Sequence, residues 1–203
     1  MRKTRSSPPA PEAVVVAFDM CSSSEIIETL TATGGVKRLQ MLFVALERLL
    51  IKRRRSLAFA PYKFTGDGWI LLFPADVDGA ELLKFMRELS AFYRAQFTKI
   101  VEPHLAHRPA VVGLTFGVDK GPLHAVKLCG QSEYVGHALH MACRLQAAVR
   151  VNGRAPAYRA LASESVFNGH FRDARGCGVV VRRTLRALGN GQRLVCRQIE
   201  LVR

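Results

Sequence analysis

The 203-residue sequence has few cysteines and no long apolar run. Its five cysteines form no CxxC pair and are odd in number, which argues against a zinc site of that spacing or a disulfide scaffold. We interpret them as reduced, mostly buried thiols of a cytoplasmic protein. No stretch reaches the roughly 18 consecutive apolar residues of a membrane-spanning helix, and the apolar run after the basic start is too short for a signal-peptide core. We therefore expect neither membrane insertion nor a targeting segment.

Acidic residues are also scarce, with 16 Asp and Glu against 30 Lys and Arg and a net charge of +14. Such a balance attracts polyanions, among them nucleic acid, anionic lipid and nucleoside triphosphates. A nucleic-acid-binding module would use basic clusters such as 52–55 and Arg182, Arg183 and Arg186 for phosphate contacts. Aromatic residues are not interleaved with these clusters as a stacking platform requires. We therefore expect no nucleic-acid partner, although this class of function stays open.

The domain organisation follows from composition along the chain. Residues 1–11 are basic and Pro-rich, which predicts a mobile arm. Apolar residues make up 49% of the chain, enough for one core. The sequence has no internal repeat, so we expect a single domain over 12–203.

Hydrophobic periodicity predicts a mixed architecture. The chain starts with a Val-rich strand, 13–18, that should be buried on both faces. Amphipathic helices are expected at 36–55, 82–100 and 137–150. Hairpins are expected where 56–64 meets 69–73, where 111–118 meets 123–128 through a turn at 119–122, and where 179–188 meets 192–202. This order predicts an α+β sandwich, in which helices pack on an antiparallel-rich sheet.

Two carboxylates are the strongest candidates for chemistry. Asp19 follows the first strand, and Asp67 lies at the tip of the first hairpin. Adjacent strands would bring them together, and oxygen ligands without Cys or His suit Mg²⁺ or Mn²⁺. Taken singly, each residue is equally well explained as a helix cap or a turn residue.

Two further segments are suited to binding phosphate. Cys21, Ser22, Ser23 and Ser24 begin a helix, whose successive backbone N–H groups suit phosphate oxygens, although serine clusters also simply form turns. On the predicted helix 137–150, Arg144 lies one turn after His140 and opposite the apolar side. An arginine there suits the charge that develops in phosphoryl transfer, but the pair equally fits an ordinary solvated helix face.

Taken together, these residues resemble the catalytic domain of class III nucleotide cyclases. The resemblance covers 12–148 nearly completely and has four ordered blocks, which makes it more specific than any single motif. The blocks are Phe18-Asp19-Met20, the run KFTGDG from Lys63 to Gly68, the run GLTFG from Gly113 to Gly117, and Tyr134-Val135-Gly136 leading into Ala142-Cys143-Arg144-Leu145.

The resemblance implies a role for each candidate. Two divalent metal ions, Mn²⁺ or Mg²⁺, would be held by Asp19, Asp67 and the Met20 carbonyl. Arg144 would stabilise the transition state, while His140 replaces the asparagine that usually orients the ribose. Lys63 and Glu133 would read the edge of the base, with Glu133 one methylene longer than the usual aspartate. Such domains act as homodimers in which each site combines a metal half from one subunit with an arginine half from the other.

The run from Phe18 to Ser24 and the run KFTGDGWILLFP are most similar to the stand-alone pyrimidine cyclases of bacterial Pycsar antiphage defence. That similarity implies that UTP, or else CTP, is converted to the 3′,5′-cyclic monophosphate, which activates a downstream effector. Lys63 and Glu133 satisfy part of either base pattern, so the chemistry leaves the base open. An ordinary adenylate cyclase and a catalytically degenerate regulatory dimer are the alternatives. The trigger and the effector cannot be read from the sequence.

Overall fold

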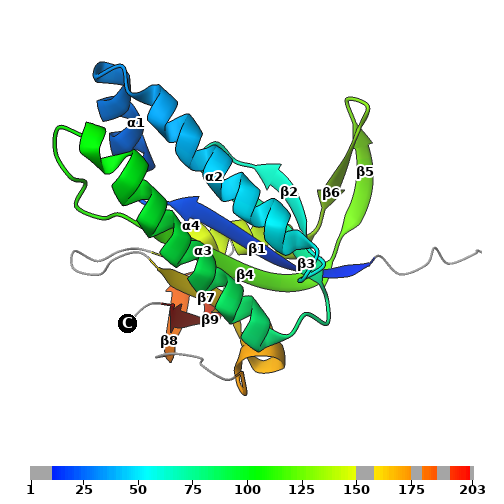
Figure 1. The fold of residues 1–203 in the computed structure, drawn as a ribbon. Helices are drawn as coiled ribbons and strands as arrows, with labels where there is room; N and C mark the ends of the chain where they lie inside the picture. The colour runs from blue at the N-terminus through cyan, green and yellow to red at the C-terminus, as the bar shows by residue number, and fades with distance from the viewer. Residues whose placement is uncertain (1–10, 150–157, 175–179, 187–192, 202–203) are drawn as a thin grey trace, which may run out of the picture.

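The computed structural model describes residues 11–149, 158–174, 180–186 and 193–201, and its central layer is a mixed sheet (Figure 1). In these ranges the sheet has seven strands in the order β2-β3-β1-β4-β7-β9-β8. Neighbouring strands are antiparallel except β4 and β7, which are parallel. The strands are β1 (Glu12–Met20), β2 (Ala60–Phe64), β3 (Gly68–Pro74), β4 (Leu114–Pro122), β7 (Arg159–Ser163), β8 (Val180–Arg186) and β9 (Arg193–Glu200).

Strand β1 is the middle of the core and confirms the predicted buried strand. Val14, Val15 and Val16 have no exposed surface. Because successive side chains of a strand point to opposite faces, Val14 and Val16 pack into the main hydrophobic cluster, whereas Val15 and Ala17 pack into a second cluster with helix residues from the other side. Asp19 continues the alternation on the side of the second cluster.

Helices cover both faces of the sheet (Figure 1). The main cluster contains buried residues of α1 (Ser23–Ala32), α2 (Val36–Arg54) and α3 (Gly79–Ile100). The second cluster contains buried residues of α4 (His137–Ala148). The predicted helices 36–55 and 82–100 correspond to α2 and α3, and 137–150 corresponds to α4, with Arg150 outside the described residues. Short helical segments complete the chain: η1 (Glu102–His104), α5 (Glu164–Val166) and η2 (Phe167–Phe171). The α+β sandwich expected from the sequence is confirmed.

The predicted hairpin with a turn at 119–122 is wrong. Strand β4 continues to Pro122 because this segment pairs with the start of β1, where Glu12 lies opposite Pro122. Buried Asp119 also accepts a hydrogen bond from the Ser163 hydroxyl at 2.5 Å. The hairpin is instead formed by β5 (His124–Leu128) and β6 (Gln131–Val135), a separate two-stranded sheet that projects from the body (Figure 1). Its turn is at Cys129 and Gly130, both with positive φ.

The other hairpins are confirmed as β2–β3 and β8–β9, with the turn of the latter outside the described residues. Strand β7 was missed. Residues 1–10 of the predicted arm, and Cys177, lie outside the described ranges. Four described cysteines are free thiols as expected, but Cys196 alone among them is buried. Within these ranges no helix has the length and apolar character needed to cross a bilayer.

Candidate active site

The two candidate carboxylates meet where β1 and β3 pair. Asp19 lies opposite Gly68 on β3, and Asp67 is the residue just before it. A Cβ at Gly68 would lie 1.9 Å from the Phe18 carbonyl oxygen, so only glycine permits this close approach. The loop is closed by a hydrogen bond of 3.0 Å from the Thr65 N–H to the Gly68 carbonyl. Adjacent strands thus bring the carboxylates together, as the sequence predicted.

The electrostatics of the pair favour a bound cation. Burial raises the pKa of Asp19 to about 7, and the Asp67 carboxyl adds to the rise through a hydrogen bond and through its charge. Two carboxylates this close cannot both ionise readily without a positive partner. The Oδ1 atom of Asp19 is buried and has no hydrogen-bond partner among the described residues.

The donor set therefore fits a hard divalent ion. Carboxylate oxygens are the ligands that Mg²⁺ and Mn²⁺ prefer, and a cation would take the place of the proton shared by the pair. Within the described part of the chain, no group of three or more His, Cys, Asp or Glu side chains could hold a metal. Asp19 and Asp67 would therefore supply the side-chain ligands, leaving positions for a backbone carbonyl, water and substrate phosphates.

Asp19 predicts a pH dependence of stability in metal-free buffer. The native protein keeps a proton on Asp19 up to about pH 7, whereas the unfolded chain releases it near its ordinary pKa of 3.8. The free energy of unfolding should therefore fall as the pH rises between these values, by about 1–2 kcal/mol after allowance for solvent screening. Denaturant unfolding of wild type and of Asp19→Asn, with EDTA present, measures this difference; Asp76→Asn is the matched control. A difference between wild type and Asp19→Asn that does not vary with pH would contradict the assignment.

The segment from Cys21 to Ser24 only partly matches its predicted role. The Cys21 N–H is not free for phosphate because it donates to the Gly113 carbonyl at 2.9 Å. Burial, with a smaller contribution from the Asp19 charge, raises the pKa of the Cys21 thiol to about 12. Ser22 caps α1 with a left-handed backbone (φ 54°) and makes no side-chain capping bond. The N–H groups of Ser23 and Ser24, in the first turn of α1, remain the phosphate-binding candidates.

Helix α4 lies directly on β4. A Cβ at Gly117 would lie 2.0 Å from the Ala142 carbonyl oxygen and 2.3 Å from the Gln146 nitrogen. The Gln146 side chain donates to the Thr115 hydroxyl at 2.8 Å and also acts on Asp19, whose pKa it lowers. Gln146, which sequence reasoning missed, thus joins α4 to the carboxylate pair.

Arg144 and His140 lie on the outer side of α4. Arg144 is two residues before Gln146, so the two side chains leave the helix about 200° apart. Both Arg144 and His140 are exposed, and neither side chain has a hydrogen bond or ion pair with any residue that the structure describes. The structure therefore does not bring them to the carboxylate pair of the same chain.

Lys63 and Glu133 are brought together between β2 and the projecting hairpin. The Lys63 Nζ atom lies 3.3 Å from both carboxylate oxygens of Glu133. Tyr62 contacts the same carboxylate through its hydroxyl. Adjacent strand residues normally point to opposite faces, but the β2–β3 register shifts between Pro61 and Lys63, so both side chains reach Glu133. Pro61, a residue confined to edge strands and bulges, is the sequence signal for this irregularity.

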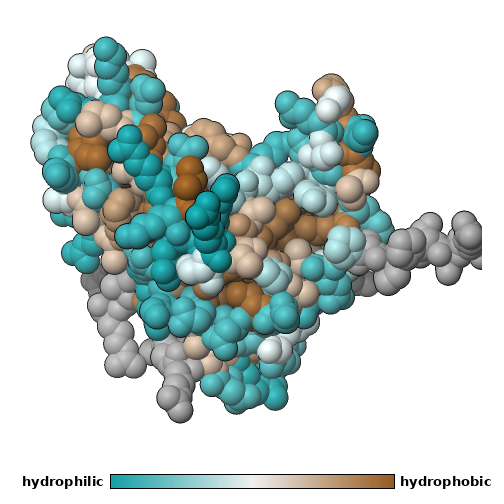
Figure 2. All heavy atoms as spheres, turned by 45° about the vertical axis from the view of Figure 1, so that its right-hand side comes forward, coloured by the Kyte–Doolittle hydropathy of each residue, from teal (hydrophilic) through white to brown (hydrophobic). Residues whose placement is uncertain are grey.

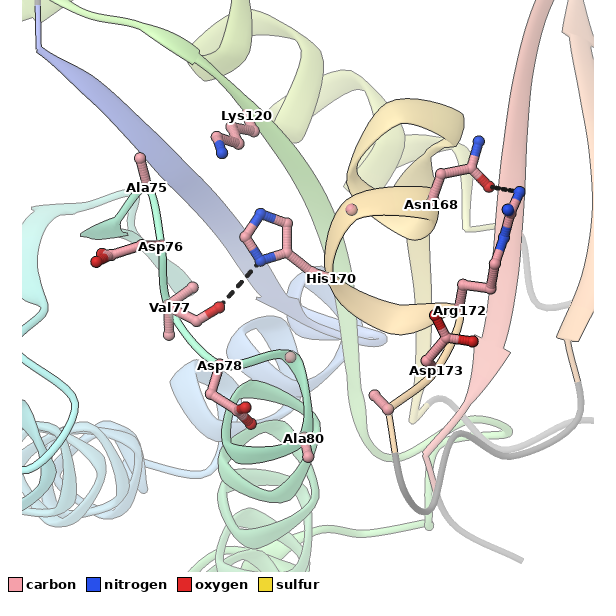
Figure 3. Close-up of a pocket in the computed structure, with 13 residues that line it drawn as sticks. Ala75, Asp76, Val77, Asp78, Ala80, Lys120, Asn168, His170, Arg172 and Asp173 are labelled. Atoms are coloured by element: carbon pink, nitrogen blue, oxygen red, sulfur yellow. Dashed lines mark hydrogen bonds between the residues drawn. The ribbon is translucent and has the colours of Figure 1, made fainter.

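A cavity of about 780 Å³ lies elsewhere, between the β3–α3 loop and the segment around η2 (Figure 3). It is lined in part by Lys120, which pairs with Val14, five residues before Asp19 and so roughly 17 Å away along the strand. One polar contact joins the two segments, where His170 Nδ1 lies 2.9 Å from the Val77 carbonyl; Asp78 instead caps α3 by accepting the Glu81 N–H. We interpret this cavity as a seam between packed segments, separate from the carboxylate site.

Solved structures, but no sequence matches, are similar to this chain. No family model matches the chain, and no curated protein matches its sequence. Among solved structures, the guanylyl cyclase Cya2 is 15% identical with a TM-score of 0.70, covering 95% of this chain and 94% of that one. The adenylyl cyclase CyaB from P. aeruginosa is 15% identical with a TM-score of 0.68, covering 93% of each chain. A monomeric adenylate cyclase from Trypanosoma brucei is 12% identical with a TM-score of 0.64, covering 96% of this chain and 90% of that one. The chain has the fold of a class III cyclase catalytic domain.

Proposed function

We propose that the protein is a nucleotide cyclase, its domain spanning 12–203, that converts a nucleoside triphosphate to the 3′,5′-cyclic monophosphate and pyrophosphate. The observation that carries the proposal is the carboxylate pair of Asp19 and Asp67, held at adjacent strand ends of a cyclase fold. The Lys63–Glu133 pair, suited to a base edge, supports it.

In the proposed reaction the ribose 3′-oxygen attacks the α-phosphorus in line, the hydroxyl proton passes to water, and the bond between the α-phosphorus and the bridging oxygen breaks, so that pyrophosphate leaves. Two divalent metal ions, held by Asp19, Asp67 and the Met20 carbonyl, would supply Lewis-acid activation and charge neutralisation. The N–H groups of the first turn of α1 bind phosphate oxygens.

The remaining residues orient the substrate and stabilise charge. The Arg144 guanidinium stabilises charge that develops at the reacting phosphate, because its planar fork of donors matches phosphate oxygens. His140 donates one hydrogen bond to the ribose. The Lys63 ammonium donates to the base and the Glu133 carboxylate accepts from it.

We infer a homodimer with composite sites. Arg144 and His140 are exposed on the side of α4 away from their own Asp19, so they must act on the carboxylates of a second subunit. Apolar side chains are exposed near the hairpins: Phe64 is 47% exposed, Val135 42% and Leu128 57%. Figure 2 shows hydrophobic residues gathered in a hollow beside the projecting hairpin. A second subunit would cover such a surface.

We favour a pyrimidine substrate, UTP before CTP, and a role for the product in antiphage signalling through a cyclic-nucleotide-activated effector. The support is the resemblance of the segments around Ser22 and Lys63 to Pycsar cyclases. The lysine donor and the carboxylate acceptor suit a base that offers an acceptor beside a donor, which pyrimidines and purines both do, so the preference rests on the resemblance.

The test is incubation of the purified protein with ATP, GTP, CTP and UTP separately, with Mn²⁺ present. Mass spectrometry should identify cyclic UMP, or else cyclic CMP, with one pyrophosphate released per product. Cyclic AMP as the main product would make the protein an adenylate cyclase. The absence of a cyclic product from all four nucleotides would refute cyclase activity and favour a regulatory dimer.

A further inference from the structure

The Glu133 carboxylate is held by a network from β2. The Tyr62 hydroxyl donates to Oε2, and the Lys63 ammonium lies 3.3 Å from Oε1 and Oε2. The same Tyr62 hydroxyl accepts the backbone N–H of Tyr134 at 2.9 Å. Tyr62 therefore joins the edge of the main sheet to both a backbone and a side-chain group of the projecting hairpin.

The direction of these hydrogen bonds is fixed by proton counting. A phenol has one proton and can accept through its lone pairs. The Tyr134 N–H is a donor, so it occupies a lone pair of the Tyr62 oxygen. The hydroxyl proton is left for Glu133, which must accept it. Glu133 is thereby kept as an ionised acceptor, and Oε1, which Tyr62 does not contact, shares the Lys63 ammonium with Oε2.

The packing holds Tyr62 in this arrangement. Its ring lies edge-on to the Tyr134 ring, with centroids 5.4 Å apart and an interplanar angle of 70°. Tyr62 also packs partly buried against the cluster formed by β1, β3 and α4. The hydroxyl is therefore presented by a rigid ring, whereas Glu133 by itself has three side-chain torsions to fix.

The charges around Glu133 agree with this arrangement. The Tyr62 hydroxyl, and then the Lys63 ammonium, hold the pKa of Glu133 below its ordinary value. Burial and the bond to Glu133 raise the pKa of Tyr62. Glu133, on β6, lies opposite the uncharged Val126 of β5, and His124 of β5 is the other titratable group on that face of the hairpin.

We propose that Tyr62 is a positioning residue for nucleobase selection: it anchors Oε2 of Glu133 so that Oε1 and the Lys63 ammonium present one acceptor beside one donor to the base. This inference rests on the proposed function, which it deepens by adding a residue to the base-reading site. Each of the four bases offers an N–H next to an acceptor, so selection depends on where the anchored carboxylate and the Lys63 ammonium are held, and a base is accepted when its N–H reaches Oε1 and its acceptor reaches Lys63 together. The reacting phosphate is contacted by neither Tyr62 nor Glu133, so the effect of Tyr62 is on binding and selection.

The test is Tyr62→Phe, which keeps the ring and its packing but removes the hydroxyl. With the nucleotide that the wild type prefers, KM should rise about tenfold with kcat little changed, as expected for loss of a hydrogen bond to a charged group. The ratio of kcat/KM between the preferred nucleotide and the next best should fall by a similar factor. Tyr93→Phe, on α3 and outside this network, is the matched control, because its buried hydroxyl has no hydrogen-bond partner in the described residues; it should leave both values unchanged. Thermal unfolding confirms that both variants fold.

A second measurement does not require turnover. Titration of ¹³C-labelled glutamate carboxyls by NMR, with Glu133→Gln to assign the signal and His124→Gln to remove the nearby histidine, should show a higher pKa of Glu133 in Tyr62→Phe. An active Tyr62→Phe enzyme with unchanged KM, selectivity and Glu133 titration would overturn the inference. A wild type that cyclises no nucleotide would instead overturn the proposed function, while the titration would still decide whether Tyr62 anchors Glu133.

Discussion

The Asp67→Ala protein is expected to form no detectable cyclic nucleotide while remaining folded. Asp67 lies in the loop before β3, outside the hydrophobic clusters, so its removal costs the core little. It is one of the two side chains that the donor set offers to a divalent ion, so turnover should fall roughly 1,000-fold or more. Cyclic-nucleotide production by mass spectrometry and thermal unfolding measure the two effects.

The matched control for this variant is Asp76→Ala. Asp76 follows β3 at the other end of the same strand; it is exposed, whereas Asp67 is half-buried, and it is far from Asp19. Its loss should leave turnover unchanged. In metal-free buffer at alkaline pH, Asp67→Ala should even be slightly more stable than wild type, because Asp67 raises the pKa of Asp19. An Asp67→Ala protein that is unfolded, or fully active, would contradict the assignment.

The Arg144→Ala protein is expected to lose activity. Co-expression with a second inactive variant is expected to restore part of that activity. Loss of a group that stabilises transition-state charge should reduce kcat by roughly 100- to 1,000-fold with little effect on KM. In a homodimer with composite sites, a subunit lacking Arg144 still supplies an intact carboxylate half, whereas a subunit lacking Asp67 still supplies an intact Arg144. Equal amounts of Arg144→Ala and Asp67→Ala, co-expressed, should therefore recover about a quarter of wild-type activity, since half of the dimers are mixed and each has one complete site.

Arg144→Lys provides the control for charge, because lysine keeps the positive charge without the planar fork of donors. It should recover only part of the lost kcat. Mixed dimers that stay inactive, with dimer formation confirmed by sedimentation, would show that each site is built within one chain. The exposed position of Arg144 on the outer side of α4 argues against that outcome.

The sequence predicted the elements that have a strong hydrophobic period. Strand β1 and helices α2, α3 and α4 follow this rule. The segment from Asp119 to Pro122 has turn composition, yet pairing with β1 and the bond from Ser163 keep it in β4. Strand β7 is five residues long and pairs in parallel with β4, a non-local contact that leaves no local pattern.

Of the candidate site, the sequence predicted the two carboxylates but not Tyr62 or Gln146. Asp19 and Asp67 lie at the ends of elements that can be identified locally, and their meeting required only that the strands be neighbours. Tyr62 was missed because alternation on a regular strand places it opposite Lys63; Pro61 signals that the strand is irregular there, but not which side chains then reach Glu133. Gln146 was missed because its contact with Asp19 depends on how α4 lies on the sheet, which Gly117 permits.

The projecting hairpin β5–β6 forms its own two-stranded sheet, apart from the sheet that carries Asp19. Glu133 therefore lies on an element whose substitutions do not disturb the register of β1, β3 and β4. Under the proposed function, the part of the base site that lies on the hairpin and the part that holds phosphate can consequently evolve at different rates. A chain with the proposed activity would therefore be able to change its base preference through hairpin substitutions while the carboxylate pair stays intact.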